Sequence, residues 1–231
     1  MTSLNSIRSA FILASVALLW ACEGETLTAG GSETDRPRAT IVAMGNSLTE
    51  GLGVAEDEAY PAQLEAQLRA RGYAYRVVNA GISGETSSGA RARLEWVLTL
   101  DPDIVILETG ANDGLRGLDP ELIRENIRWL VEAFLKRDIV VVLAAMRIVS
   151  NMGPEYTRAF AEIYLDIARA TDVILIPFFL KGVGGEPHLN QADGIHPTAE
   201  GYTVIVENIF PHVVDAIERH RSDKARVGAP D

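Results

Sequence analysis

A serine stands two residues beyond an apolar run near the start of the chain. The run Thr40–Met44 is rich in β-branched and other apolar residues, and Gly45 ends it two residues before Ser47. In an α/β chain such a strand would deliver the serine to the carboxyl edge of a parallel sheet, where active sites gather. Ser47 can act there as a nucleophile if a histidine and amide donors converge on it. The alternative is a helix cap, because residues 47–50 have the pattern of a capping box.

A carboxylate and an imidazole lie on one short segment late in the chain. Asp193 and His196 are three residues apart, just before Pro197. This spacing lets Asp193 accept the Nδ1–H of His196 and leaves Nε2 to take a proton from Ser47, as in a catalytic triad. The alternative for His196 is a capping residue beside the proline. The histidines at 188, 212 and 220 have no comparable neighbour and are not assigned to the site.

Two further segments at expected strand ends could stabilise a developing oxyanion. Asn112, in the segment 109–114, can present a carboxamide N–H. Gly81, in the segment 79–86, lets the backbone approach a ligand closely and present its own N–H. Taken separately, each segment is also typical of a simple turn.

The four segments together are far more specific than any one of them. Gly-x-Ser-Leu at 45–48, Gly81, Gly-x-Asn-Asp at 110–113 and Asp-x-x-His-Pro at 193–197 resemble the SGNH hydrolases, also called GDSL esterases and lipases. The resemblance covers most of residues 40–210. It is closest to the bacterial group of thioesterase I, lysophospholipases and arylesterases.

This resemblance implies a serine esterase or thioesterase that works through an acyl-serine intermediate. The roles that it implies are nucleophile for Ser47, base for His196, orienting carboxylate for Asp193, and oxyanion donors for the backbone N–H groups of Ser47 and Gly81 and the side chain of Asn112. The family usually has an aspartate where this chain has Asn46. Because an amide keeps the hydrogen-bonding shape but not the charge, we expect tuning of the activity rather than its loss.

Short apolar runs alternate with amphipathic segments from Ala39 onward. The apolar runs predict five strands buried on both faces, at Ile41–Met44, Arg76–Asn79, Ile104–Glu108, Ile139–Ala144 and Val173–Ile176. The amphipathic segments predict helices at Ala59–Arg71, Ser87–Leu100, Pro120–Lys136, Pro154–Ala170 and Pro197–Arg219. Five β-α units predict an α/β fold, a three-layer α/β/α sandwich with a doubly wound parallel sheet. This agrees with the flavodoxin-like fold that the resemblance implies. Residues 39–219 would form this domain and 220–231 a polar, frayed tail.

Three loops are expected to frame the acyl pocket, at 114–119, 147–153 and 178–190. Phe178, Phe179 and Leu180 could line it, and they could equally belong to the core.

The first 21 residues have the features of a bacterial export signal. Arg8 supplies a positive charge, and the apolar stretch Phe11–Trp20 is too short to span a bilayer. Residues 19–22 resemble a lipobox, so we expect a lipid on Cys22 and attachment to the cell envelope. The alternative is an ordinary signal peptide with an incidental cysteine. Residues 22–38 are typical of a flexible tether.

Composition limits the remaining classes of function. The net charge is −11 and no basic cluster occurs, which argues against nucleic acid as a partner. Cys22 is the only cysteine, so no intrachain disulfide can form. The sequence has neither a metal-ligand cluster nor a phosphate-loop lysine, so we expect no cofactor or metal. No obligate protein partner is inferred.

Two other functions stay open. A carbohydrate O-deacetylase with the same triad would need an open, polar groove around it. An envelope-anchored binding protein with an idle site would not react with a fluorophosphonate at Ser47.

Overall fold

The structure is a computed structural model that describes residues 39–148 and 152–227. The expected export signal, the lipidation site Cys22 and the tether lie outside these ranges. So do residues 149–151 of one expected pocket loop and the last four residues of the chain. Within the described ranges, no helix has both the length and the apolar character needed to cross a membrane.

A five-stranded parallel sheet lies at the centre of the domain. The strands are β1 (Ala39–Gly45), β2 (Tyr75–Gly81), β3 (Ile104–Leu107), β4 (Val140–Ala144) and β5 (Ile174–Ile176). Their spatial order is β2-β1-β3-β4-β5. Every residue of β1, β3 and β4 is buried, as expected for strands that are covered on both faces. All five expected strands are confirmed.

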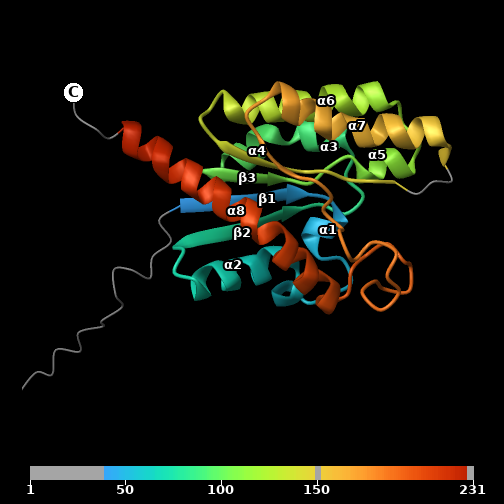
Figure 1. Cartoon of the computed structure of the whole chain (residues 1–231), viewed down its shortest axis with the longest axis horizontal. Helices are drawn as coiled ribbons and strands as arrows, with labels where there is room; N and C mark the ends of the chain where they lie inside the picture. Colours follow the sequence, from blue (N-terminus) through green and yellow to red (C-terminus); the bar gives the residue numbers. More distant parts are fainter. Residues whose placement is uncertain (1–38, 149–151, 228–231) are drawn as a thin grey trace, which may run out of the picture. The chain divides into compact units, whose positions relative to one another are not determined.

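Helices cover both faces of the sheet (Figure 1). One layer contains α2 (Tyr60–Ala70) and α8 (Ala199–Val227); the other contains α3 (Ser87–Ala92), α4 (Leu94–Leu98), α6 (Pro120–Leu135) and α7 (Pro154–Ala170). Three short helices complete the described elements: α1 (Ser47–Glu50), the 3₁₀ helix η2 (Glu56–Glu58) and α5 (Ala111–Leu115). The expected three-layer α/β/α sandwich is therefore confirmed.

The spacing of apolar residues explains how the helices dock on the sheet. In α6 the fully buried side chains Ile123, Ile127, Leu130 and Phe134 recur every three or four residues, which places them on one face of the helix. Burying each such side chain contributes about 1.5–3 kcal/mol. These contacts hold the strand ends, and therefore the site, in a fixed frame.

The expected helix at 87–100 is divided in two. Arg93 lies between α3 and α4 with φ −105° and ψ 13°, outside helical geometry. Its guanidinium group reaches inward, and Nη2 lies 2.7 Å from Glu85 Oε2. The ion pair therefore accompanies the break between the two helices.

The last helix also differs from the expectation at both ends. It begins at Ala199 rather than Pro197, and Thr198 Oγ1 accepts a hydrogen bond from the N–H of Gly201 at 3.2 Å. It continues to Val227, so residues 220–227 are helical rather than frayed.

A buried histidine explains this longer helix. His220 Nδ1 lies 2.8 Å from Tyr75 Oη, and Nε2 lies 3.1 Å from Asp103 Oδ1. His220 therefore does have a carboxylate neighbour, at the amino-terminal end of the sheet. The sequence expectation that it had none was wrong.

Candidate active site

Ser47 is the first residue of α1, directly beyond the carboxyl end of β1. Figure 1 shows α1, α5 and the loop between β5 and α8 at the end of the sheet toward which the strand arrows point. Asn46, not Ser47, caps α1, because Asn46 Oδ1 accepts the N–H of Leu48 at 2.9 Å. The capping-box interpretation of Ser47 was therefore wrong, and the Ser47 hydroxyl is not used as a cap.

Three polar side chains form a continuous hydrogen-bonded chain at this edge. Ser47 Oγ lies 2.8 Å from His196 Nε2, and His196 Nδ1 lies 2.6 Å from Asp193 Oδ2. Ser47 and His196 are 149 residues apart in the sequence. The structure thus brings the expected serine, histidine and aspartate together in the expected order.

Asp193 is held as a carboxylate by several donors. Its Oδ1 accepts the backbone N–H groups of His196 at 3.0 Å and Ile195 at 2.9 Å. The backbone and then the side chain of His196, followed by the Ile195 N–H, lower the pKa of Asp193 to about 2. Asp193 therefore stays ionised at any ordinary pH and can stabilise a positive charge on His196.

The loop that carries Asp193 and His196 is fastened to the segment after α1. Gln191 Nε2 donates to Leu52 O at 2.7 Å and to Pro197 O at 3.0 Å, while the Gln191 N–H donates to His196 O at 2.7 Å. These bonds fix the imidazole ring relative to Ser47.

Two of the three expected oxyanion donors carry an N–H hydrogen that no acceptor in the described residues receives. Among residues 39–148 and 152–227, no acceptor receives the Ser47 N–H, which lies at the beginning of α1. Asn112 Nδ2 donates one hydrogen to Glu85 O at 3.0 Å, and its second hydrogen has no acceptor in the described part of the chain. The bond to Glu85 orients the carboxamide.

The structure contradicts the assignment of Gly81 as the third donor. The Gly81 N–H donates to Asn79 Oδ1 at 3.0 Å, so it is not free. A Cβ atom at residue 81 would lie 2.1 Å from Glu50 N, which shows that glycine is needed there for close packing against α1. Gly84 is the better candidate. It has φ 77°, its N–H meets no acceptor in the described ranges, and it adjoins Glu85.

Three charged residues that support the site were not expected from the sequence. Arg93 Nη2 donates to Gly45 O at 3.2 Å and to Glu85, and so links the end of β1 to the segment that orients Asn112. Glu108 is fully buried directly after β3. The sequence signal for Glu108 was slight: one acidic residue that ends an otherwise apolar strand.

Four exposed apolar side chains belong to the connections at the carboxyl edge of the sheet. Leu52 follows α1, Ile82 follows β2, Leu115 ends α5 and Ile195 lies between Asp193 and His196; all four are exposed. Large exposed apolar side chains that gather at one place mark a binding surface for an apolar group.

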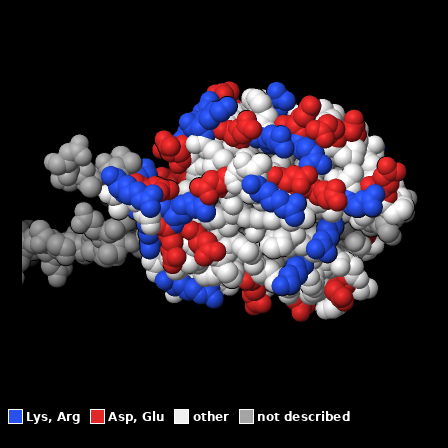
Figure 2. Space-filling model, turned by 45° about the horizontal axis from the view of Figure 1, so that its top comes forward, with Lys and Arg blue, Asp and Glu red and all other residues white. Residues whose placement is uncertain are grey.

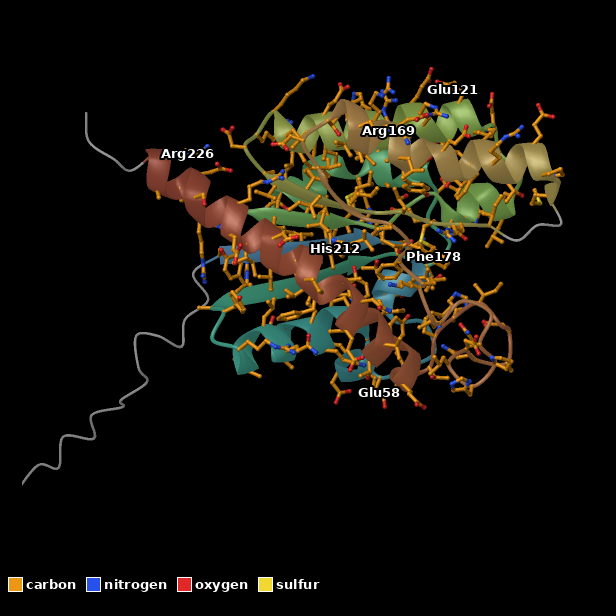
Figure 3. The ribbon with its side chains drawn as sticks, viewed as in Figure 1. Glu58, Glu121, Arg169, Phe178, His212 and Arg226 are labelled. Atoms are coloured by element: carbon orange, nitrogen blue, oxygen red, sulfur yellow. The ribbon has the colours of Figure 1, made fainter. Side chains whose placement is uncertain are left out.

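The residues considered for the pocket lining divide between core and surface. Phe179 is fully buried and packs edge-to-face against Tyr60, with ring centroids 5.3 Å apart, so it belongs to the core. Leu180 packs against the core as well. Phe178 is half-buried under the guanidinium group of Arg147, and Figure 3 shows it at the same end of the sheet as α1.

A hollow of about 470 Å³ lies on the loop before His196. Its lining is Gly185, Glu186, Pro187, Asn190, Gln191, Ala192 and Gly194. Because neither Ser47 nor Asn112 lines it, we do not identify this hollow with the acyl pocket. The hydrogen-bonded chain, rather than a deep cavity, defines the site.

In the part of the chain that the structure describes, no cluster of three or more His, Cys, Asp or Glu side chains is arranged to hold a metal ion. His212 lies on α8, away from the carboxyl edge (Figure 3).

Comparison with known proteins identifies relatives of this chain. Residues 43–204 match the model of the GDSL-like lipase/acylhydrolase family. Esterase TesA of Pseudomonas aeruginosa is 39% identical over 173 residues, covering 74% of this chain and 86% of that protein. An arylesterase of Vibrio mimicus is 34% identical over 75% of this chain and 88% of its own length. Thioesterase 1/protease 1/lysophospholipase L1 of Escherichia coli K12 is 35% identical over 73% of this chain and 80% of its own length.

Solved structures agree with these matches. The crystal structure of TesA superposes with a TM-score of 0.74 at 38% identity, covering 77% of this chain and 99% of that one. Esterase EstA of Pseudoalteromonas sp., in a structure inhibited by monoethylphosphonate, has a TM-score of 0.74 at 30% identity, covering 78% and 99%.

Proposed function

Because the chain belongs to the GDSL-like lipase/acylhydrolase family and is a serine esterase or thioesterase, we propose that Ser47 is its nucleophile and His196 its general base. Asp193 holds His196 in the correct tautomer and stabilises its protonated form. The observation that carries this proposal is the chain of bonds at 2.8 Å and 2.6 Å from Ser47 through His196 to Asp193.

The reaction has two acyl-transfer steps. Ser47 Oγ attacks the carbonyl carbon of the substrate while its proton passes to His196 Nε2, which gives a tetrahedral oxyanion. When that intermediate collapses, the bond to the alcohol or thiol breaks, and the leaving group takes the proton from His196. Water then loses a proton to His196 and attacks the acyl-serine, so that the acid is released and Ser47 is protonated again.

Three donors stabilise the oxyanion in this proposal. They are the N–H groups of Ser47 and Gly84 and the side-chain amide of Asn112. Such donors act on charge that develops only in the transition state, so they lower the barrier without tightening substrate binding. Gly84 replaces Gly81, whose N–H is held by Asn79.

The substrate is an acyl ester or thioester with an apolar acyl or aryl group. The exposed side chains of Leu52, Ile82, Leu115 and Ile195 support an apolar partner at the reacting carbonyl. They argue against the open, polar groove that an acetylated sugar would need. The relatives named arylesterase, thioesterase and lysophospholipase support the same substrate classes.

Export and a lipid anchor are also part of this proposal. The support comes from the sequence of residues 1–22, with its short apolar stretch and the single cysteine at a small-residue cleavage site.

Nucleic acid finds little support as a partner. On the face drawn in Figure 2, basic and acidic side chains are interspersed instead of forming a basic stripe.

Replacing the nucleophile tests this function. Ser47→Ala should abolish hydrolysis of nitrophenyl butyrate and of an acyl thioester, while its melting temperature stays close to that of the wild type. Ser222→Ala, which makes the same change on α8, should keep full activity. Turnover in purified Ser47→Ala protein would remove Ser47 from its role. A wild type that releases acetate from acetylated sugars but leaves both acyl substrates intact would favour the deacetylase.

A further inference from the structure

Glu108 lies directly beneath the turn that presents the nucleophile. β1 and β3 are neighbours in the sheet, with Met44 paired to Leu107. The Glu108 N–H donates to Met44 O at 2.9 Å, which places Glu108 beside Gly45. A Cβ atom on residue 45 would lie 2.6 Å from Glu108 Oε2, so the glycine makes room for the carboxyl group.

The carboxyl group of Glu108 accepts three hydrogen bonds from two residues close to Ser47, the cap of α1 and a residue in its first turn. Oε1 accepts from Asn46 Nδ2 at 2.6 Å. Oε2 accepts from the Asn46 N–H at 3.2 Å and from Thr49 Oγ1 at 3.0 Å. Among the described residues Glu108 has no hydrogen bond to Ser47 itself, so it acts on Ser47 through Asn46 and Thr49.

Glu108 is fully buried, and in the described ranges no basic side chain forms an ion pair with it. The titratable groups that face it are Tyr60 of α2, Glu85 before α3, Tyr164 of α7 and Tyr202 of α8. The nearby guanidinium group of Arg93 is bound to Glu85 and Gly45 O. Burial raises the pKa of Glu108 to about 8, although the three hydrogen bonds oppose this and Glu85 adds to it.

We propose that Glu108 is a positioning residue for acyl transfer, which in its ionised form holds Asn46 and Thr49 so that Ser47 keeps both its Oγ and its N–H in reacting geometry. This inference rests on the proposed role of Ser47. It also gives Asn46 a role, because an amide at this position donates to an ionised Glu108, whereas two carboxyl groups 2.6 Å apart would have to share a proton.

Ionisation of Glu108 at alkaline pH should lower the stability of the fold and raise kcat. The folded-state pKa lies above the usual value of 4.5. The stability that Glu108 contributes is therefore fully present below the unfolded-state pKa and is lost as the pH rises through about 8. A neutral side chain of the same shape escapes this loss, so Glu108→Gln should melt no lower than the wild type at pH 9.

A glutamine at position 108 should nevertheless slow the reaction. Its amide turns a donor toward Asn46 Nδ2, or else Asn46 must turn over and give up the bond to the Leu48 N–H. We expect kcat at pH 9 to fall by about 10- to 100-fold with KM changed less than twofold. The wild-type kcat should rise several-fold between pH 7 and 9, and Glu108→Gln should lack that rise.

Exchanging the two groups gives the decisive comparison. Asn46→Asp alone should lose rate as the pH rises, because its pair must keep a shared proton. The double variant Asn46→Asp/Glu108→Gln restores complementarity, since the carboxylate introduced at position 46 can accept from the amide introduced at position 108 and still cap α1. It should recover at least about fivefold in kcat over Glu108→Gln, a coupling that independent sites would not show.

Asp103→Asn serves as the matched control, because that carboxylate accepts the Thr40 N–H at the opposite end of the sheet. It should change the melting temperature but not kcat. Wild-type kcat and pH profile in Glu108→Gln would overturn the inference. So would a rate loss that follows a lower melting temperature and is not relieved in the double variant. If Ser47→Ala retains hydrolysis, the proposed function itself fails; if Ser47→Ala is inactive and Glu108→Gln is normal, only this inference fails.

Discussion

His196 lies between two oxygens that have different tasks. In the proposed mechanism, Ser47 Oγ, at 2.8 Å from Nε2, would supply the proton that His196 takes, and Asp193 Oδ2, at 2.6 Å from Nδ1, would accept the opposite ring N–H. Because the pKa of Asp193 is lowered to about 2, a change from pH 8 to pH 5 does not protonate it. Loss of activity in that range must therefore come from groups other than Asp193.

Asn112 is another single residue with a testable role, because its amide is expected to stabilise the negative charge that develops on the oxyanion. Asn112→Ala should lower kcat and kcat/KM together by about 10²–10³, with KM little changed. Asn112→Asp should be at least as harmful, because a carboxylate would repel the oxyanion. Steady-state kinetics beside a melting curve tests this. A folded Asn112→Ala enzyme with near-normal kcat would remove Asn112 from the oxyanion hole.

At the scale of elements, local patterns predicted the strands well and the helix ends poorly. The buried strands are continuous apolar runs, as expected for strands that are covered on both faces of the sheet. The break at Arg93 depends on Glu85, and the end of α8 depends on the bond between His220 and Tyr75, which are 145 residues apart. No local pattern contains such distant partners.

The same distinction separates the site residues that could be predicted from those that could not. Asp193 and His196 could be predicted because their spacing alone lets them pair. The choice between Gly81 and Gly84 could not, because it depends on where the side chain of Asn79 points. Glu108 was missed because its partners, the cap of α1 and a residue in its first turn, are far from it in the sequence.

The bond between His220 and Tyr75 should anchor the end of α8 to the sheet. His220→Phe removes the hydrogen bond to the buried Tyr75 hydroxyl group and the contact with Asp103. The free energy of unfolding should fall by about 1–3 kcal/mol. Activity should not change, because His220 lies at the opposite end of the sheet from Ser47. Denaturant unfolding measures the effect, and His212→Phe on the same helix is the matched control. Equal stability of the two variants would contradict the anchoring role.

At the scale of the whole molecule, the strand order explains how distant segments meet. Parallel strands end at one edge, so the residues after β1, β2 and β3 and those beyond β5 all come together there. The sheet and its helices therefore serve as a rigid support, while the chemistry is carried by the connections at this edge.

The expected lipid anchor is a property of the full chain. Two or more acyl chains on Cys22 would suffice for stable membrane attachment. Cys22→Ser should therefore move the protein from the detergent phase to the aqueous phase in a phase-partition experiment, with kcat for a soluble ester unchanged. A wild-type protein found wholly in the aqueous phase would show that Cys22 carries no lipid.

Covalent trapping tests most directly whether Ser47 becomes acylated during turnover. A fluorophosphonate should add one label per molecule, peptide mapping should locate it on Ser47, and the loss of esterase activity should parallel labelling. Ser47→Ala should take up no label and hydrolyse no ester. A label on a different residue, or an enzyme that stays fully active while Ser47 is labelled, would contradict the role of Ser47 as nucleophile.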